Sequence, residues 1–350
     1  MAESQSNLEK VAERFRRFVT QETASSPLYT RLSLAIAADP LVQKIAAHSQ
    51  PGQPIPNMLF GAVHYLLLQD SAAPLAAYYP DLASGKARTD DPYPLFQAFC
   101  LENRAAIIEL LESRLVQTNE VQRCTCLLPA FGLVMQTATD HRLALIEIGP
   151  SAGLNLLWDQ YYYDYGAAGS YGNPDSPLHL KGVLRGEKRP PFPAQWPTVV
   201  SRVGLDLNPL DLRDPQNVLW LRALIWPEHL ERAARLQRAI EVDSSNRLDL
   251  RAGNALELLP EALEEAPAEA TLCLYHSFTL NQFTPQMRQE LRMLVADFSQ
   301  RRPVFMISLE SQREAFPLLS LTSFNRGETY EQSLARCDPH GAWLEWQAEL

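Results

Sequence analysis

The chain has 350 residues, enough for one large domain or two smaller ones with a sizeable core. Apolar residues make up 46% of the sequence and charged residues 21%, which is typical of a globular protein and argues against a disordered one. The formal net charge of −10 at pH 7 excludes the basic footprint of a general nucleic-acid-binding protein. No apolar run approaches the roughly 20 residues that span a bilayer, and the first residues do not read as a secretory signal. We therefore expect a cytoplasmic protein without nucleic-acid or membrane partners.

Residues 1–140 are predicted to form a helical N-terminal region. Apolar residues recur at helical spacing from Phe15 onward, and the pattern is interrupted at Asp39-Pro40 and by the proline-rich stretch 50–57. The five cysteines of the chain are scattered, and Cys124-x-Cys126 lacks a second pair at zinc spacing. We expect buried, reduced cysteines and no metal site.

Residues 141–350 change to short apolar runs that alternate with helical patterns. This alternation predicts an α/β fold with a mainly parallel sheet covered on both faces, and the family resemblance described below implies that it is Rossmann-like. The predicted strands are Leu143–Ile148, Val199–Asp206, Asp249–Arg251, Thr271–His276 and Val304–Glu310, with helices at Leu230–Val242 and Pro285–Phe298. Residues 341–346 alternate in polarity and are predicted to add an edge strand.

An insertion near 160–198 separates the first two predicted strands. It contains an additional strand candidate at 178–185. An insertion at this position would lie over the ligand end of the sheet, as a lid or a substrate wall, or it would be a hairpin without a role in the site.

The first predicted strand ends in a glycine turn. Glu147 lies at the strand end, Gly149 and Gly153 bound the turn, and Ser151 lies between them, before a helix-like pattern. Such a turn presents backbone N–H groups to a nucleotide-like ligand, although it also closes units that bind nothing. Ser151 occupies space that a pyrophosphate needs, which disfavours NAD. The pattern resembles the first motif of class I S-adenosylmethionine-dependent methyltransferases, and this resemblance implies that Glu147 helps to hold the cofactor's ammonium group.

Two later strand ends extend this pattern. Asp206 ends the second strand, where an acid can accept both ribose hydroxyls of an adenosyl group, although Asp206-x-Asn208-Pro209 also suits a turn or a helix cap. Gly253-Asn254-Ala255 follows the third strand and resembles the methyltransferase stretch near the adenine, which usually reads Gly-Asp-Ala. Asn254 keeps an acceptor oxygen and loses the charge.

Two residues are candidate proton acceptors. His276 ends the fourth strand, where its ring would suit a general base, although a hydrogen-bonded structural histidine is also common there. Glu120 is the second candidate, in a polar stretch that either projects Asn119 and Glu120 towards the cofactor or is a helix boundary with Thr118 or Asn119 as its cap.

Longer strings indicate a family. The chain resembles a bacterial family of unknown function, DUF2332, from about Leu28 to Trp346. The strings are VQTNEV, EIGPSAGLNL, YDYG, GLDLNPLD and PHGAWLEW. The resemblance implies a methyltransferase-like Rossmann fold and carries over no catalytic residue.

These observations together predict an S-adenosylmethionine-dependent methyltransferase with an unknown small-molecule or protein acceptor. The alternatives are an NAD-dependent oxidoreductase and a non-catalytic module of the same fold that binds nucleotides or proteins.

Overall fold

The computed structural model of the chain describes residues 2–138, 141–243, 248–312 and 315–349. The chain forms two compact units. The first comprises Met1–Thr118 and Leu212–Ala234, and the second comprises Asn119–Asp211 and Arg235–Leu350. The first unit thus takes in a segment from the middle of the sequence, and residues 119–140 belong to the second unit.

The first unit is helical, as expected for the N-terminal region. Three of its helices begin at Pro residues whose preceding side chains cap them. Ser26 accepts a hydrogen bond from the Tyr29 N–H, Asp39 accepts one from the Leu41 N–H, and Asp214 accepts one from the Gln216 N–H. The Asp39-Pro40 interruption is therefore a helix start. The helices are α1 (Ala2–Gln21), α2 (Pro27–Ile36), α3 (Pro40–Ala46), α4 (Ile55–Gln69), α5 (Tyr93–Glu102), α6 (Arg104–Ser113) and α8 (Pro215–Ala223), with 3-10 turns η1 (Thr23–Ser25) and η2 (Pro74–Tyr78).

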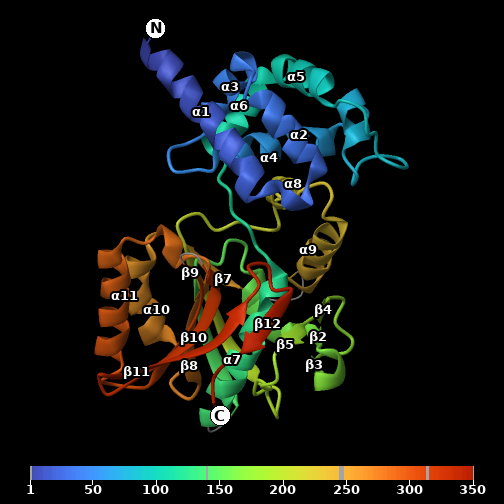
Figure 1. Cartoon of the computed structure of the whole chain (residues 1–350). Helices are drawn as coiled ribbons and strands as arrows, with labels where there is room; N and C mark the ends of the chain where they lie inside the picture. The colour runs from blue at the N-terminus through green and yellow to red at the C-terminus, as the bar shows by residue number, and fades with distance from the viewer. Residues whose placement is uncertain (1, 139–140, 244–247, 313–314, 350) are drawn as a thin grey trace. The chain divides into compact units, whose positions relative to one another are not determined.

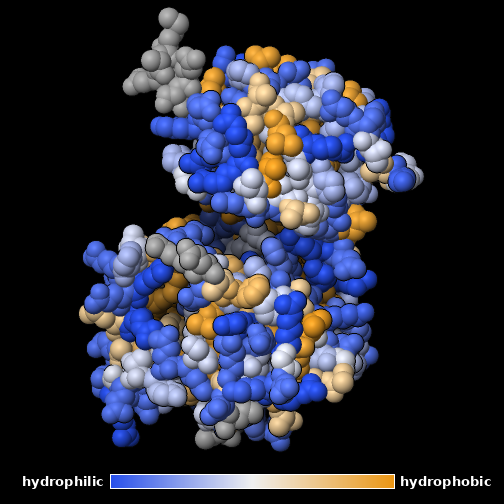
Figure 2. Space-filling model, viewed as in Figure 1, coloured by the Kyte–Doolittle hydropathy of each residue, from blue (hydrophilic) through white to orange (hydrophobic). Residues whose placement is uncertain are grey.

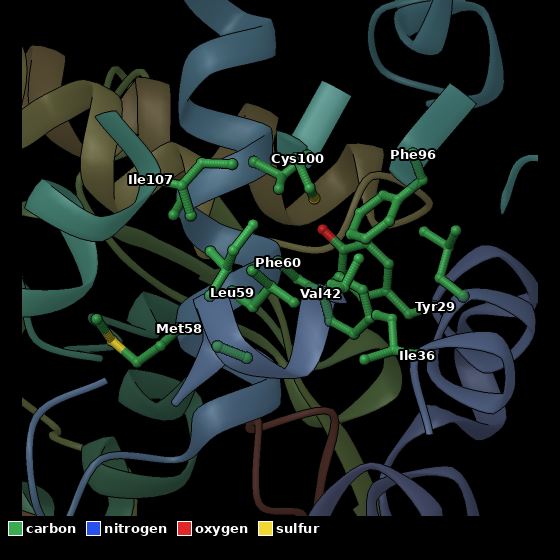
Figure 3. Packing of buried hydrophobic residues seen from close by; sticks show 14 of the residues in the cluster. Tyr29, Ile36, Val42, Met58, Leu59, Phe60, Phe96, Cys100 and Ile107 are labelled. Atoms are coloured by element: carbon green, nitrogen blue, oxygen red, sulfur yellow. The ribbon is translucent and has the colours of Figure 1, made fainter. Parts of the chain in front are cut away.

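Helix α4 runs through the core of this unit. Its Phe60 stacks on Tyr29 with ring centroids 4.1 Å apart, and Phe96 packs edge-on against Phe60, as Figure 3 shows. Trp220 of α8 is fully buried, and its indole N–H donates to the Leu115 carbonyl at 2.8 Å. The middle segment of the sequence is therefore part of this core.

The second unit is a mixed α/β structure built on a nine-stranded, mostly parallel sheet (Figure 1). Its strand order is β5-β12-β11-β10-β9-β8-β1-β6-β7. The strands are β1 (Arg142–Ile148), β5 (Val183–Arg185), β6 (Thr198–Asp206), β7 (Asp249–Ala252), β8 (Thr271–Ser277), β9 (Val304–Gln312), β10 (Ala315–Asn325), β11 (Glu328–Cys337) and β12 (Trp343–Trp346). All five predicted strands of the parallel part are confirmed as β1, β6, β7, β8 and β9.

Helices cover both faces of this sheet. Helices α10 (Ala255–Glu265) and α11 (Pro285–Phe298) lie side by side on one face, where Leu291 and Val295 pack with Ile146 of β1. Helix α7 (Cys124–Thr137) packs on the other face, where Phe131 meets the Tyr275 ring edge-on. Burial on both faces explains why the central strands are continuous apolar runs. Helix α9 (Leu230–Asp243) follows α8 in the connection from β6 to β7.

The segment after the glycine turn is not the expected helix. It forms the 3-10 helix η4 (Leu154–Gln160), in which Leu157 has non-helical dihedral angles. The Tyr161 hydroxyl donates to the Leu154 carbonyl, and all side chains from Leu154 to Asp159 are buried. A segment buried all round has no solvent face, so it lacks the one-sided pattern of an amphipathic helix.

The strand expected at 178–185 is two strands in different sheets. Strand β4 (His179–Lys181) joins the small sheet β3-β2-β4, and β5 joins the edge of the large sheet. The break falls at Gly182, where a Cβ atom would overlap the Tyr165 ring. The partners in the small sheet are β2 (Tyr162–Asp164) and β3 (Ser170–Gly172), which η5 (Gly166–Ala168) connects.

The C-terminal strand exists, but it is not an edge strand. Strand β12 pairs with β11 on one side and with β5 on the other. Strands β10 and β11, which the sequence reading missed, form an antiparallel meander with β9.

The polarity of the surface and the burial of the cysteines agree with what the composition predicts. On the face shown in Figure 2, hydrophilic residues cover most of each unit, and hydrophobic residues occur in small patches. All five cysteines are free and buried, as expected. Among the described residues, no helix combines the length and the apolar character that crossing a membrane requires.

Candidate functional site

The carboxyl ends of the parallel strands define the candidate site. Strand β1 pairs with β6 on one side and β8 on the other, so the strand order reverses at β1. In open α/β sheets, ligands bind outside the carboxyl ends of the strands at such a reversal. The glycine turn, Asp206, Asn254 and His276 all lie at this edge of the sheet.

The two glycines of the turn are required by its geometry. Gly149 and Gly153 have φ values of +72° and +79°, in the left-handed region that favours glycine. A Cβ atom at Gly149 would overlap Thr279 Oγ1, and one at Gly153 would lie 2.7 Å from Leu248 Cδ1. The turn thus packs against the segment that follows β8.

Ser151 is the strained residue of the turn. Its φ is +55°, which is uncommon for a residue with a side chain. Its Oγ atom is buried and has no hydrogen-bond partner among the described residues. Backbone strain and an unpaired buried hydroxyl are both costly, and such features cluster at functional sites.

Asp206 is oriented by two backbone N–H groups. Its Oδ2 accepts from the Ser151 N–H at 2.9 Å, and its Oδ1 accepts from the Asn208 N–H at 2.8 Å. The residue is partly exposed at the end of β6. A carboxylate has about four lone-pair sites, so two acceptor positions remain for a ligand.

A second N–H of the turn is also engaged by the protein. The Leu154 N–H donates to Asn119 Oδ1 at 3.0 Å. With the Ser151 N–H on Asp206, two turn donors therefore bind side chains of this unit. The sequence pattern alone assigned these donors to a ligand.

Glu147 is enclosed at the end of β1. Its side chain is buried, and the Tyr275 hydroxyl donates to its Oε2 at 3.0 Å. Burial raises the pKa of Glu147 to about 8, although hydrogen bonds from Tyr275 and Asn155 oppose the shift. The carboxyl group is therefore mainly protonated at neutral pH in this conformation.

Asn254 caps helix α10. Its Oδ1 accepts from the Leu256 N–H at 3.1 Å, and its Nδ2 donates to Glu257 Oε1 at 3.0 Å. Ala255 is the first residue of α10, and its side chain is buried in the core beside the sheet. The Gly253 N–H donates to the Asp206 carbonyl at 2.9 Å, so this stretch lies next to Asp206.

His276 is paired with a residue that the sequence reading missed. Its Nδ1 lies 2.7 Å from Oε1 of Glu310, near the end of β9. The same oxygen accepts from the N–H groups of Thr279 at 3.0 Å and Leu280 at 3.1 Å. His276 is fully buried, and its Nε2 has no hydrogen-bond partner among the described residues.

His276 and Glu147 lie on opposite faces of the sheet. His276 pairs in register with Ile148, and Tyr275 pairs with Glu147. Because successive side chains alternate between faces, Glu147 points to the α7 face and His276 to the α10–α11 face. The structure thus brings the glycine turn, Asp206 and Asn254 together, and it keeps His276 apart from Glu147.

Glu120 caps the 3-10 helix η3 (Val121–Arg123). Its Oε1 accepts from the Gln122 N–H at 3.3 Å and lies 3.9 Å from Arg235 Nη2. Neither Thr118 nor Asn119 is this cap. The adjacent Arg123 guanidinium lies 4.0 Å above the Phe278 ring, beside the end of β8.

Glu310 could have been predicted as a site residue from the sequence. It is the last residue of the predicted strand 304–310, and ligands bind at the carboxyl ends of such strands. In contrast, the Asn119–Leu154 bond joins residues that are 35 positions apart and leaves no mark in the sequence. Among the described residues, no group of three or more His, Cys, Asp or Glu side chains is placed to hold a metal ion.

The fold and the site define a mixed α/β protein with polar groups gathered at the carboxyl edge of a mostly parallel sheet. The chain belongs to the family described as "Uncharacterized protein conserved in bacteria (DUF2332)", whose model matches residues 12–346. No curated protein and no solved structure matches the chain.

Proposed function

We propose that the chain binds S-adenosylmethionine at the carboxyl edge of the large sheet and transfers its methyl group to a small-molecule or protein acceptor. The observation that carries the proposal is Asp206, a partly exposed carboxylate held by two backbone N–H groups beside the glycine turn. An acid in this position suits the two hydroxyls of an adenosyl ribose. The strand order also supports the proposal, because numbering β1, β6, β7, β8 and β9 in chain order gives the spatial order 3-2-1-4-5, which is similar to that of nucleotide-binding Rossmann sheets.

The residues at this edge fit an adenosyl ligand with an amino-acid tail. Asp206 would accept the ribose hydroxyls, and the unpaired Ser151 Oγ would bind a polar group of the tail. Asn254 Oδ1 uses one lone pair for its helix cap and keeps another for the adenine amino group. Glu147 would approach the ammonium group only after its enclosure opens, since it is buried in this structure.

The hydrogen bonds that the glycine turn already makes favour S-adenosylmethionine over NAD. A dinucleotide places its pyrophosphate on free backbone N–H groups at a helix N-terminus. Here the N–H groups of Ser151 and Leu154 bind Asp206 and Asn119, and no α-helix follows the turn. A ligand without phosphate groups does not need those donors.

When bound, S-adenosylmethionine supplies an electrophilic methyl group. The chain would contribute positioning, through Asp206 and the turn, and a proton acceptor. His276 is the better candidate for that acceptor because its Nε2 is unpaired, whereas Glu120 is engaged as the cap of η3.

A ligand panel tests this proposal. We expect S-adenosylmethionine and S-adenosylhomocysteine to raise the thermal unfolding midpoint and NAD to leave it unchanged, since a ligand at 100 times its Kd stabilises a protein by about 2.7 kcal/mol. Stabilisation by NAD alone would contradict the proposal and favour an oxidoreductase.

Methyl transfer is tested with a radiolabelled methyl donor and a fractionated bacterial extract. We expect label to enter an extract component with the wild-type protein, and much less with His276→Ala. Cofactor binding without transfer to any component would contradict an enzymatic function and favour a binding module.

A further inference from the structure

We infer that His276 and Glu310 form a general-base pair, in which Nε2 of His276 takes the proton of a hydroxyl or amine acceptor and Glu310 is the positioning residue. This inference rests on the proposed function for the identity of the reaction. The geometry that carries it is the 2.7 Å contact between His276 Nδ1 and Glu310 Oε1, together with the unpaired Nε2.

The hydrogen bonds around Glu310 place the shared proton on the imidazole. Glu310 Oε1 accepts from the N–H groups of Thr279 and Leu280, so this oxygen already serves as an acceptor. At 2.7 Å from this acceptor oxygen, an unprotonated Nδ1 would set its lone pair against those of the oxygen, so the attractive arrangement has the hydrogen on Nδ1. In the neutral ring, a proton on Nδ1 leaves a lone pair on Nε2.

That lone pair has no partner among the residues that the structure describes. His276 is fully buried, and no described residue satisfies Nε2. Oε2 of Glu310 is likewise buried and has no hydrogen-bond partner in the described part of the chain. A buried histidine with a purely structural role is expected to use both nitrogens, as His64 does in the first unit, where Nδ1 contacts the Ala223 carbonyl and Nε2 contacts Asp81. The contrast marks His276 as a group that is kept available for a ligand.

The arrangement also defines a class of acceptor. In the proton transfer, the bond between the acceptor atom and its hydrogen breaks, the electron pair stays on the acceptor atom, and a new N–H bond forms at Nε2. The nearby Glu310 carboxylate then stabilises the imidazolium cation. A hydroxyl or a primary or secondary amine needs such a base, and a thioether or a tertiary amine has no proton to give. Because His276 is buried, the acceptor reaches Nε2 only when neighbouring chain moves on binding.

The test is the tautomer of His276, read by nitrogen-15 NMR of the full-length protein labelled at histidine. The nitrogen signals of His276 are identified as those that disappear in the spectrum of His276→Gln. In the neutral ring of His276, we expect protonated Nδ1 and unprotonated Nε2 in the wild-type protein. Glu310→Gln keeps an acceptor oxygen, so we expect the same tautomer, whereas Glu310→Ala is expected to lose the Nδ1–H signal. Glu290→Ala, an exposed glutamate on α11, serves as the matched control.

Two outcomes would overturn the inference. A wild-type ring protonated at Nε2 would place the lone pair towards Glu310 and remove the base. An unchanged tautomer in Glu310→Ala would show that Glu310 is not the positioning residue. If Glu310→Ala does not fold, the comparison of the wild type with Glu310→Gln still tests where the proton lies. These spectra need no cofactor, so they are independent of whether S-adenosylmethionine binds, which the ligand panel decides separately.

Discussion

Glu147 is the residue with the clearest effect on how the unfolding free energy depends on pH. Its folded-state pKa is about 8, raised from 4.5 mainly by burial, so the folded protein keeps a proton that the unfolded chain loses above about pH 4.5. The contribution to stability is therefore fully present below pH 4.5 and is lost as the pH rises through about 8. The size is on the order of a few kcal/mol.

We accordingly expect Glu147→Gln to flatten the dependence of unfolding free energy on pH between about 5 and 8. The amide keeps an acceptor for the Tyr275 hydroxyl and cannot ionise. Urea denaturation at several pH values measures the effect, with Glu290→Gln as the control for removing an exposed charge. An identical pH slope in the wild type and Glu147→Gln would show that Glu147 is not enclosed.

Gly149 tests the packing of the turn against the segment after β8. Alanine at a positive φ lowers the unfolding free energy by roughly 1–2 kcal/mol. Gly52→Ala should show this backbone cost without any steric overlap, since a Cβ atom at Gly52 meets nothing within 4 Å. Gly149→Ala should cost about 1–3 kcal/mol more because of the overlap with Thr279. Thr279→Ala in the same chain should recover part of that excess in urea denaturation. Equal losses for the two glycine variants would contradict the contact.

Among the elements, helix α10 shows how one residue serves both a local structure and the candidate site. Asn254 caps its first turn by accepting from the Leu256 N–H, and its side-chain amide donates to Glu257. We expect Asn254→Ala to lower the unfolding free energy by about 1 kcal/mol and Asn254→Ser to leave it nearly unchanged, because Ser caps as well as Asn and places no second charge beside Glu257. Thermal unfolding without ligand measures this, and stability equal to the wild type in Asn254→Ala would exclude the cap.

The elements also show what the sequence could predict. The parallel strands were predictable because burial on both faces makes them continuous apolar runs, and Thr284-Pro285 marked the start of α11, where Thr284 accepts from the Met287 N–H. The 3-10 helix η4 was not predictable from local pattern, because it is stabilised by distant groups such as Asn119. The same holds for the site: strand ends located Asp206 and His276, whereas the opposite faces of His276 and Glu147 required the register of β1 and β8.

For the whole molecule, the division into two units depends on tertiary contacts that no local motif reveals. Trp220 is far in sequence from the N-terminal helices, yet it packs in the core of the first unit, against Gly61 of α4. Truncation of a buried Trp costs about 3–5 kcal/mol. We expect Trp220→Ala to reduce amide protection in residues 2–118, measured by hydrogen exchange and mass spectrometry.

Trp158→Ala is the matched control, since Trp158 is equally buried but stacks on Phe131 in the second unit. It should reduce protection among residues 119–211 instead. Loss of protection in the second unit alone after Trp220→Ala would contradict the assignment of the middle segment to the first unit.

Calorimetric titration with S-adenosylmethionine and S-adenosylhomocysteine tests the proposal that Asp206 holds an adenosyl ligand. Hydrogen bonds to a charged group contribute about 1.5–3 kcal/mol each, so Asp206→Ala should weaken binding at least about tenfold. Asp297→Ala, an exposed acid on α11, should bind like the wild type. Heat of binding in the wild type and the Asp297 variant, with a large loss in the Asp206 variant, is the predicted result; no heat from the wild type with either ligand at millimolar concentration would contradict the claim.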